Sequence, residues 1–173
     1  MPLGSSTKRY ETPNHPFQGE RISSEHDLVD RYGLANKGEL WRVQSRLRDF
    51  RREARRLLGR RATGGEANAE SDEFLARLRR LGILGEEDGL DAVLGLSVED
   101  VLERRLQTLV YRQGLANTVD QARQFVVHGH VVVGDSQVRE PSYRVTEREA
   151  GTIRFTETSP LADELHPERA EDQ

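Results

Sequence analysis

The sequence predicts an α+β protein, in which a helical N-terminal lobe precedes a small module of two helices and a short, mostly antiparallel sheet. Apolar residues recur at alternating steps of three and four over residues 38–58, which indicates one long amphipathic helix. Between Tyr111 and Val133, a second short helix is bounded by glycines and followed by a run of valines. These patterns divide the chain into an extended arm (1–24), a helical lobe (25–96), an αβ module (97–156) and an acidic tail (157–173).

Length and composition restrict the possible classes of protein. A chain of 173 residues can form one compact domain or two small ones. With 35% hydrophobic and 32% charged residues, we expect a modest core and a highly charged surface. The absence of cysteine excludes disulfides and thiolate metal sites. No apolar run approaches the roughly 18 residues of a membrane span, and no signal-peptide pattern opens the chain, so we expect a cytosolic protein without a membrane partner.

The basic residues are almost all arginine, since Lys8 and Lys37 are the only lysines among 26 basic residues. Scarce lysine together with many acidic residues fits a proteome adapted to high salt, but a GC-rich genome also favours arginine codons. Both interpretations stay open. Refolding in molar KCl and in dilute buffer distinguishes them, because equal stability in the two would exclude the high-salt interpretation.

The arm at 1–24 contains Pro2, Pro13 and Pro16 and has few apolar residues. Its composition predicts an extended segment that needs a partner surface to become ordered, or else a disordered terminus. Ser24 can cap a helix that starts at Glu25 and ends at Gly33.

The long helix at 38–58 buries one apolar stripe and carries a dense set of arginines. Unneutralised like charges destabilise a helix, so a polyanion such as RNA is the expected partner of this face. A solvated face whose arginine stems cover apolar surface would explain only two or three of them. A helical scaffold for other proteins is a further alternative, although the stripe is short for a stable coiled coil. The arginines are Arg42, Arg46, Arg48, Arg51, Arg52, Arg55, Arg56, Arg60 and Arg61.

Several local signals complete the prediction for the helical lobe. Trp41 is expected to pack against a neighbouring helix or the arm rather than to stack on a base. Residues 62–71 are expected to form a flexible loop, followed by helices at 72–81 and near 90–94. The acidic residues 86–88 lack the spacing of a calcium loop and indicate a solvated turn. Ser97 and Asp100 form a capping box that opens a helix over 98–113.

The αβ module continues with a helix that Thr118 and Gln121 begin as a second capping box. Its core face is Val119, Ala122, Phe125 and Val126, opposite a polar face. Gly134 and Asp135 then form a hairpin turn, from which residues 137–139 return antiparallel. Pro141 marks an edge or crossing segment, and 152–155 is the last strand. The acidic tail has few core candidates, and we expect it to be mobile.

Seven segments carry a resemblance to a known family. They are KRYETPNHPF (8–17), RYGLANKGELWRVQSRLRDFRREARRLL (31–58), LARLRRLGIL (75–84), RRLQTLVYRQG (104–114), TVDQAR (118–123), HGHVVVGDSQV (128–138) and PSYRV (141–145). Together they resemble the family of ribosomal protein four of the small subunit, in its archaeal and eukaryotic branch. The resemblance extends to about Phe155, and the scarcity of lysine suggests a haloarchaeal member.

The resemblance implies a structural component of the small ribosomal subunit, without catalytic residues, cofactor or small-molecule substrate. Such a protein binds small-subunit rRNA first, nucleates assembly of the 5′ domain, lies beside ribosomal protein five near the path by which mRNA enters, and contributes to translational accuracy. The arm is less basic than is usual in the family and the tail is acidic. The cysteine-based zinc site of some relatives is impossible in this chain. The implied RNA contacts are Arg105, Arg112, Thr118, Gln121, Arg123, Gln124, His128, His130 and Tyr143.

Two other classes of protein share the RNA-binding module. A pseudouridine synthase or another RNA-modifying enzyme needs a large catalytic domain beside it, whereas the region before Val98 is helical and arginine-rich and 18 residues follow Phe155. A nucleolar pre-rRNA processing factor has similar motifs, but the short chain and the lysine depletion favour the ribosomal protein. His128 and His130 lack a nearby third ligand for a metal, so RNA contact or a hydrogen-bonded turn is the expected role of each.

Overall fold

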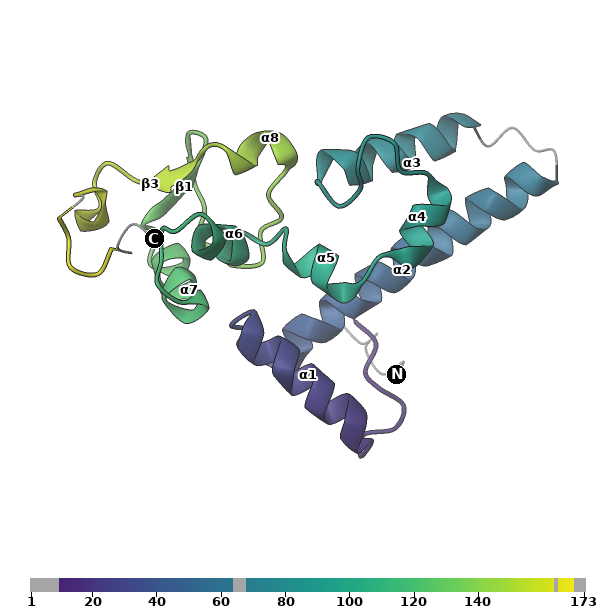
Figure 1. The fold of residues 1–173 in the computed structure, drawn as a ribbon, viewed down its shortest axis with the longest axis horizontal. Coiled ribbons are helices and arrows are strands. Elements are labelled where there is room, and N and C mark those ends of the chain that lie inside the picture. Colours follow the sequence, from purple (N-terminus) through teal and green to yellow (C-terminus); the bar gives the residue numbers. More distant parts are fainter. Residues whose placement is uncertain (1–9, 64–67, 164, 170–173) are drawn as a thin grey trace, which may run out of the picture.

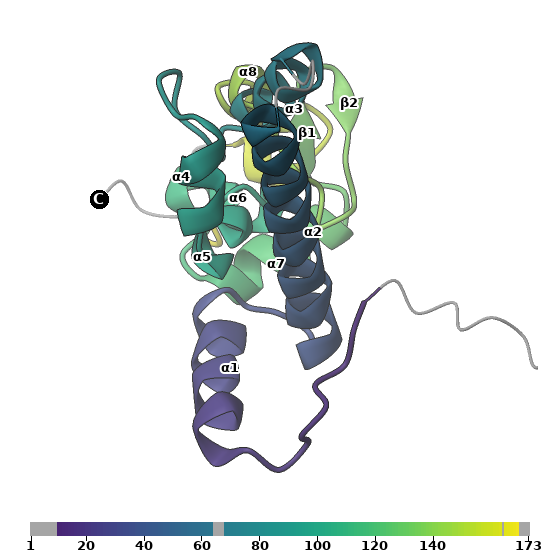
Figure 2. The same cartoon turned by 90° about the vertical axis from the view of Figure 1, so that its right-hand side faces the viewer.

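A single long helix, α2 (Lys37–Ala62), is the element on which the N-terminal half of the molecule is built (Figure 1). The structure is a computed structural model that describes residues 10–63, 68–163 and 165–169. Helix α1 (Gly19–Arg31) crosses the beginning of α2, while α3 (Asn68–Arg80), α4 (Leu90–Gly95) and α5 (Val98–Leu102) pack along it (Figure 2). The predicted α+β class is confirmed.

The amphipathic stripe of α2 is buried as predicted. Leu40, Leu47, Phe50, Ala54 and Leu57 are all buried in the structure. The Asn36 side chain caps the helix by accepting a hydrogen bond from the Glu39 backbone N–H. The helix is longer than predicted and continues past Gly59 to Ala62, because a single glycine costs a helix only about 1 kcal/mol.

Helix α1 begins earlier than the sequence predicts. It starts at Gly19, and Gln18 occupies the N-cap position without a side-chain hydrogen bond. Ser24 therefore does not cap a helix at Glu25. It lies inside α1, where its hydroxyl donates to the Arg21 carbonyl, a bond with which serine satisfies itself in helices. Residues 1–9 of the predicted arm lie outside the described residues.

Trp41 packs against a neighbouring helix and the arm, which confirms its predicted role. Its indole Nε1 donates to the carboxylate of Glu25, which is buried on α1. The ring of Tyr10 lies 6.1 Å away between centroids. Glu25 also forms ion pairs with Arg21 and Lys37, so the arm, α1 and the start of α2 share one polar cluster.

The helical lobe has its own hydrophobic core, in which α3 and α4 cover the second half of α2. Helix α3 begins at Asn68, so part of the loop predicted at 62–71 is helical, and residues 64–67 lie outside the described residues. In the acidic turn, the Asp88 carboxylate accepts a hydrogen bond from Gly85 N–H, and Arg79 donates to the Asp88 carbonyl. These bonds give the turn a structural role.

The helix predicted over 98–113 is two helices. The capping box of Ser97 and Asp100 is confirmed, but α5 ends at Leu102 and α6 (Leu106–Arg112) begins after Arg105. The first N–H groups of a helix need partners outside it. Here Leu106 N–H donates to the carbonyl of Tyr143, and the side chain of Thr108 donates to the carbonyl of Leu102. The returning segment 141–145 thus stabilises a break that no glycine or proline marks.

The αβ module contains a small antiparallel sheet with strand order β2–β1–β3. Strand β1 (Val131–Val133) pairs with β2 (Ser136–Gln137) through the predicted hairpin and with β3 (Ile153–Phe155), in the register Val132↔Gln137 and Val132↔Arg154. The sheet packs on α6 and α7 (Val119–Val127). The return strand is shorter than the predicted 137–139, and the helix α8 (Glu147–Ala150), capped by Thr146 and Glu149, was not predicted.

The tail contributes to the module core, contrary to the sequence prediction. Leu161, in a 3-10 turn at Pro160–Ala162, is 4% exposed and packs in the core cluster of the module. The Ser159 hydroxyl lies 2.8 Å from His130 Nδ1. Residues 164 and 170–173 lie outside the described residues. Among the helices of the described ranges, none is long and apolar enough to cross a membrane.

Candidate nucleic-acid interface

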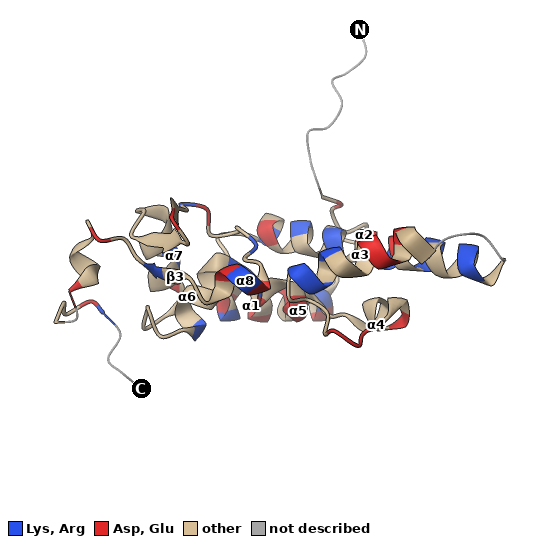
Figure 3. Cartoon of the chain, turned by 90° about the horizontal axis from the view of Figure 1, so that it is seen from above, with Lys and Arg blue, Asp and Glu red and all other residues tan. Residues whose placement is uncertain are grey.

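The exposed arginines of α2 form a basic surface on the helical lobe. Figure 3 shows basic positions along the length of α2, whereas the turn before α4 is acidic. The nitrogen-to-oxygen distances show that several of these arginines pair with exposed carboxylates: Arg48 with Glu11, Arg52 with Asp49, Arg56 with Glu53 and Glu70, and Arg60 with Glu70. We call Arg48, Arg52, Arg55, Arg56, Arg60 and Arg61 the outer arginine face.

The ion pairs of the outer arginine face do not fix its charges in place. Exposed pairs contribute little free energy, and salt screens them further. Arg55 and Arg61 of this face, and Arg46 in the groove described below, have no carboxylate within 4 Å among the residues that the structure describes. Phosphate groups can therefore replace the carboxylates or bind the remaining arginines at small cost.

Arg51 differs from the other arginines of α2. Its side chain is half-buried, and its Nη2 donates to the carbonyl of Leu96, the residue that follows α4. A buried peptide carbonyl needs such a donor. The structure therefore gives Arg51 a structural contact between α2 and α4, and its predicted RNA contact stays untested.

A groove of about 890 Å³ lies between the first half of α2 and the αβ module. Arg42 and Arg46 line it from α2, and Tyr143 and Arg144 line it from the segment that crosses back over α6. Five arginines and three carboxylates contribute to its wall, so its net charge is positive. The remaining charged residues of the wall are Arg105, Arg123, Glu39, Asp49 and Glu140.

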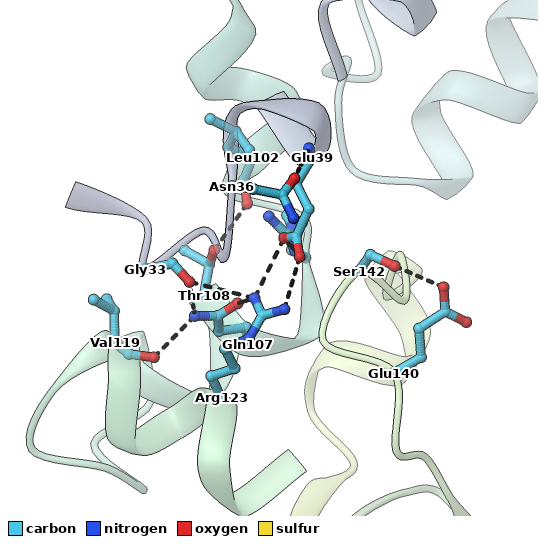
Figure 4. Close-up of polar contacts among 11 residues, drawn as sticks. Gly33, Asn36, Glu39, Leu102, Gln107, Thr108, Val119, Arg123, Glu140 and Ser142 are labelled. Carbon is cyan, nitrogen blue, oxygen red and sulfur yellow. Dashed lines mark hydrogen bonds and ion pairs between the residues drawn. The ribbon is translucent and has the colours of Figure 1, made fainter. Parts of the chain in front are cut away.

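Glu39, Arg105 and Arg123 line this groove, and because their side chains are poorly exposed we call these three residues its floor. Figure 4 shows the Glu39 carboxylate facing the Arg123 guanidinium. Glu39 Oε2 lies 2.7 Å from Arg105 Nη2, and Glu39 Oε1 lies 2.7 Å from Arg123 Nη2. Burial by itself would raise the pKa of Glu39, but the hydrogen bonds and charges of Arg123 and Arg105 outweigh it and hold that pKa below its usual range. Two predicted RNA contacts of the module are thus engaged within the protein.

Gln107 extends this network and was missed by the sequence analysis. Its side chain is fully buried, and its Nε2 donates to the carbonyls of Gly33 and Val119. Its Oε1 accepts from Arg123 Nη1 at 3.3 Å. Glu39 was missed as well, although a glutamate three residues after a capping asparagine, directly before an arginine-rich stretch, is a signal that the sequence carries.

The predicted contacts on α7 are positioned by a helix cap. Thr118 accepts from Gln121 N–H as predicted, while Gln121 Oε1 accepts from the backbone of Asn117 rather than of Thr118. Gln121 also donates to Glu168 of the tail. Gln124 and His128 are exposed. This group does not contribute to the groove wall.

The remaining predicted contacts take part in local bonds. Arg112 pairs with Glu103 at 2.8 Å, and this charge together with the Tyr32 hydroxyl holds the pKa of Glu103 down against the opposing effect of burial. Tyr143 donates to Glu149. His130, which bonds Ser159, has its pKa lowered by burial and by His128. In the described part of the chain, no group of three or more His, Asp or Glu side chains is arranged to hold a metal.

Comparison with known proteins gives a family-model match within the αβ module and relatives that match the whole chain. The sequence model of the S4 domain matches residues 104–149, which begins at the break between α5 and α6. Small ribosomal subunit protein uS4 of Natronomonas pharaonis is 64% identical over 174 residues, covering all of both chains. The protein of the same name from Haloarcula marismortui is 63% identical over 100% of this chain and 99% of its own, and that of Halobacterium salinarum is 65% identical over 96% and 95%.

Proposed function

The chain belongs to the uS4 family of small-subunit ribosomal proteins, and on that premise we propose that it is a structural, non-catalytic component of the small ribosomal subunit that binds rRNA. Its place would be the cytoplasmic ribosome of a halophilic archaeon. The full-length match to ribosomal proteins argues against an RNA-modifying enzyme, whose catalytic domain would have no counterpart in these relatives.

One observation carries the proposal. The exposed arginines of α2 continue into a groove whose opposite wall belongs to the matched S4 domain. Arg42 and Arg46 line the groove, and Arg56 and Arg60 lie further along the same side of α2, with Asp49 and Glu53 between the two pairs. A row of guanidinium groups at this spacing suits the closely spaced phosphates of folded RNA.

In this proposal the lobe at 25–96 supplies most of the phosphate contacts and the module at 97–156 fixes the register on the RNA. Arg105 would contribute through Nε and Nη1, which are buried and have no hydrogen-bond partner among the described residues. A phosphate that enters the groove would supply one. The proposed contacts remain Arg42, Arg46, Arg48, Arg51, Arg52, Arg55, Arg56, Arg60, Arg61, Arg105, Arg112, Thr118, Gln121, Arg123, Gln124, His128, His130 and Tyr143.

The finer role is a further part of the proposal. The protein would bind early to a multi-helix junction and nucleate assembly of the 5′ domain of the small-subunit rRNA. In the mature subunit it would lie beside ribosomal protein five, near the path by which mRNA enters, and would contribute to translational accuracy. Support for this comes from family membership.

Crosslinking of the protein in purified ribosomal particles, followed by sequencing of the attached RNA, tests the proposal. We expect crosslinks to concentrate at one multi-helix junction of small-subunit rRNA and to involve peptides from both α2 and the module. Crosslinks scattered over the rRNA without a common junction, or absent from the small subunit, would contradict the proposed function.

A further inference from the structure

Glu39 is a carboxylate on the floor of a groove whose wall contains five arginines. If the groove binds RNA, as proposed above, this negative charge repels the phosphates and weakens their binding. A neutral residue at this position would make the groove more basic. The contacts of Glu39 indicate what its charge accomplishes instead.

Both carboxylate oxygens of Glu39 are used to hold the αβ module. Oε2 binds Arg105, at the start of α6, and Oε1 binds Arg123 on α7 (Figure 4). The side chains of Glu39, Arg105 and Arg123 are 13%, 4% and 26% exposed. Charge-assisted hydrogen bonds between such poorly exposed groups are short and directional. They therefore fix two helices of the module relative to the first turn of α2.

The position of Glu39 within α2 strengthens this interpretation. Asn36 is the N-cap and accepts from Glu39 N–H, so Glu39 is the third residue of the helix. A glutamate at this position commonly turns back and accepts from the N-cap backbone. Here the side chain extends to the module, and the capped end of α2 becomes the attachment point of the second half of the molecule.

Gln107 connects the same two parts of the chain by a second route. From α6 it donates to the carbonyl of Gly33 in the turn before α2, and its Oε1 accepts from Arg123. The buried apolar cluster beside Gly33 consists of Tyr32, Leu34, Leu40 and Leu102, and no residue of α6 or α7 belongs to it. A buried ion pair is weak evidence for net stability, and in some proteins such groups specify the conformation instead. The orientation of α6 and α7 relative to α2 is therefore held by this polar network, while α3 and α8 make a separate contact between the lobe and the module.

We propose that Glu39 is a positioning residue that sets the orientation of the αβ module relative to α2, and thereby the selectivity for one rRNA architecture at some expense of general affinity. This inference rests on the proposed function. The orientation makes the arginines of α2 and the module's surface bind one RNA junction together. Without Glu39, α2 and the αβ module each still bind phosphates, but they no longer have a single orientation relative to one another.

The substitution Glu39→Gln tests the inference, with Asp49→Asn as a matched control. Asp49 lines the same groove, but its side chain is 65% exposed and pairs with Arg52 in its own helix. Both substitutions remove one negative charge, so both should raise affinity for an unrelated RNA duplex by a similar factor. Asp49→Asn should raise affinity for a fragment of the small-subunit rRNA junction by the same factor, so that its ratio of junction to duplex affinity is unchanged. Glu39→Gln should lower this ratio about tenfold.

A distance measurement separates positioning from other effects. The chain has no cysteine, so nitroxide labels can be placed at Ala76→Cys in α3 and Ser136→Cys in β2, both exposed. We expect a narrow label-to-label distance distribution in the parent and in Asp49→Asn. In Glu39→Gln it should broaden without RNA and narrow when the junction fragment binds, while the circular dichroism of the folded protein is retained.

The possible outcomes are distinct. An unchanged affinity ratio or an unchanged distance distribution in Glu39→Gln would overturn the inference. A lower ratio with a narrow distribution would overturn it too, because Glu39 would then act by direct contact with RNA. If the parent protein does not prefer the junction to the duplex, the proposed function fails instead, and the label distances still decide whether Glu39 positions the module.

Discussion

The outer arginine face of α2 and the floor of the groove use the same residue type for different purposes. Arg52 is exposed and pairs with a carboxylate in its own helix, whereas Arg105 is buried and pairs with Glu39 across the boundary between lobe and module. The exposed arginine can exchange its partner for a phosphate at little cost. The buried one cannot leave its partner without leaving a charge unpaired. Burial, rather than residue type, separates the arginines that can exchange a carboxylate for a phosphate from those that must keep it.

This difference in burial predicts that removing an arginine from the floor of the groove lowers the stability of the protein strongly, whereas removing one from the outer arginine face hardly changes it. Arg105→Ala leaves Glu39 with one partner and opens space beside α6, and we expect a loss of about 3 kcal/mol in the free energy of unfolding. Arg52→Ala should change it by less than about 0.5 kcal/mol. Urea denaturation of both variants at one salt concentration measures this. Equal losses would remove the distinction between the two regions.

The close packing of the turn before α2 predicts the next effect. Gly33 has φ +55°, and a Cβ there would lie 2.7 Å from Gln107 Nε2, which donates to the Gly33 carbonyl. Gly114 has φ +73°, but a Cβ there would meet no atom within 4 Å. Both Gly→Ala substitutions force alanine into a left-handed conformation, which costs about 1–2 kcal/mol.

Thermal unfolding of the two glycine variants therefore isolates the contact with Gln107. The melting temperature should fall further for Gly33→Ala than for Gly114→Ala, since only the former disturbs the network. A smaller loss for Gly33→Ala would mean that Gln107 can shift freely, and that the floor of the groove is less rigid than its hydrogen bonds indicate.

On the outer arginine face, changing the guanidinium group should affect RNA binding more than the stability of the fold. Replacing Arg48, Arg52, Arg55 and Arg56 by lysine preserves the charge but removes bidentate donors. In molar KCl the Debye length is about 3 Å, so long-range attraction contributes little and close contacts dominate. We expect affinity for the rRNA junction to fall about tenfold with the fold intact. Filter binding in 2 M KCl tests this, and unchanged affinity would contradict it.

Single arginines should differ in their effect on the salt dependence of RNA binding. Arg46→Ala, at an arginine with no described carboxylate within 4 Å, should reduce the slope of log affinity against log salt by about one phosphate contact. Arg123→Ala should reduce it by less, because its charge is already balanced by Glu39. Equal reductions would indicate that the pair with Glu39 opens when RNA binds.

The sequence predicted what depends on local periodicity and missed what depends on distant partners. The apolar stripe and the arginines of α2 follow from helical spacing, as do the caps at Ser97 and Thr118. The break before α6 could not be predicted. It requires a partner for the Leu106 N–H at the start of α6, and that partner is the carbonyl of Tyr143, far along the chain. Gln107 could not be distinguished from other polar helix residues, because its partner Gly33 is distant in the sequence.

The candidate site shows the same division. Nothing in the sequence distinguishes Arg123 from the exposed arginines of α2, because the difference is the nearby Glu39 carboxylate. Likewise, Leu161 belongs to a segment whose acidic composition indicates a mobile tail, yet a single leucine in a 3-10 turn was enough to reach the module core. Composition describes a segment as a whole, whereas burial depends on individual side chains.

The smallest expected effect concerns two carboxylates whose pKa values both lie below the usual range. The pKa of Glu70 is lowered by hydrogen bonds and charges from exposed arginines, mainly Arg60. The pKa of Glu39 is lowered by Arg123 and Arg105, although burial by itself would raise it. Salt screens exposed charges and has little access to buried ones. Raising KCl from 0.1 to 2 M should therefore move the pKa of Glu70 toward its ordinary value and leave that of Glu39 low.

Carboxyl NMR titration of the folded protein at the two salt concentrations measures this difference. A folded-state pKa below the unfolded value stabilises the protein above the unfolded pKa, and the stabilisation is lost as the pH falls through the folded one. In high salt, acid should thus weaken the attachment of the αβ module through Glu39 after the contribution of Glu70 has already disappeared. A parallel rise of both values with salt would show that water and ions reach the floor of the groove, and that the two regions do not differ in the way their burial indicates.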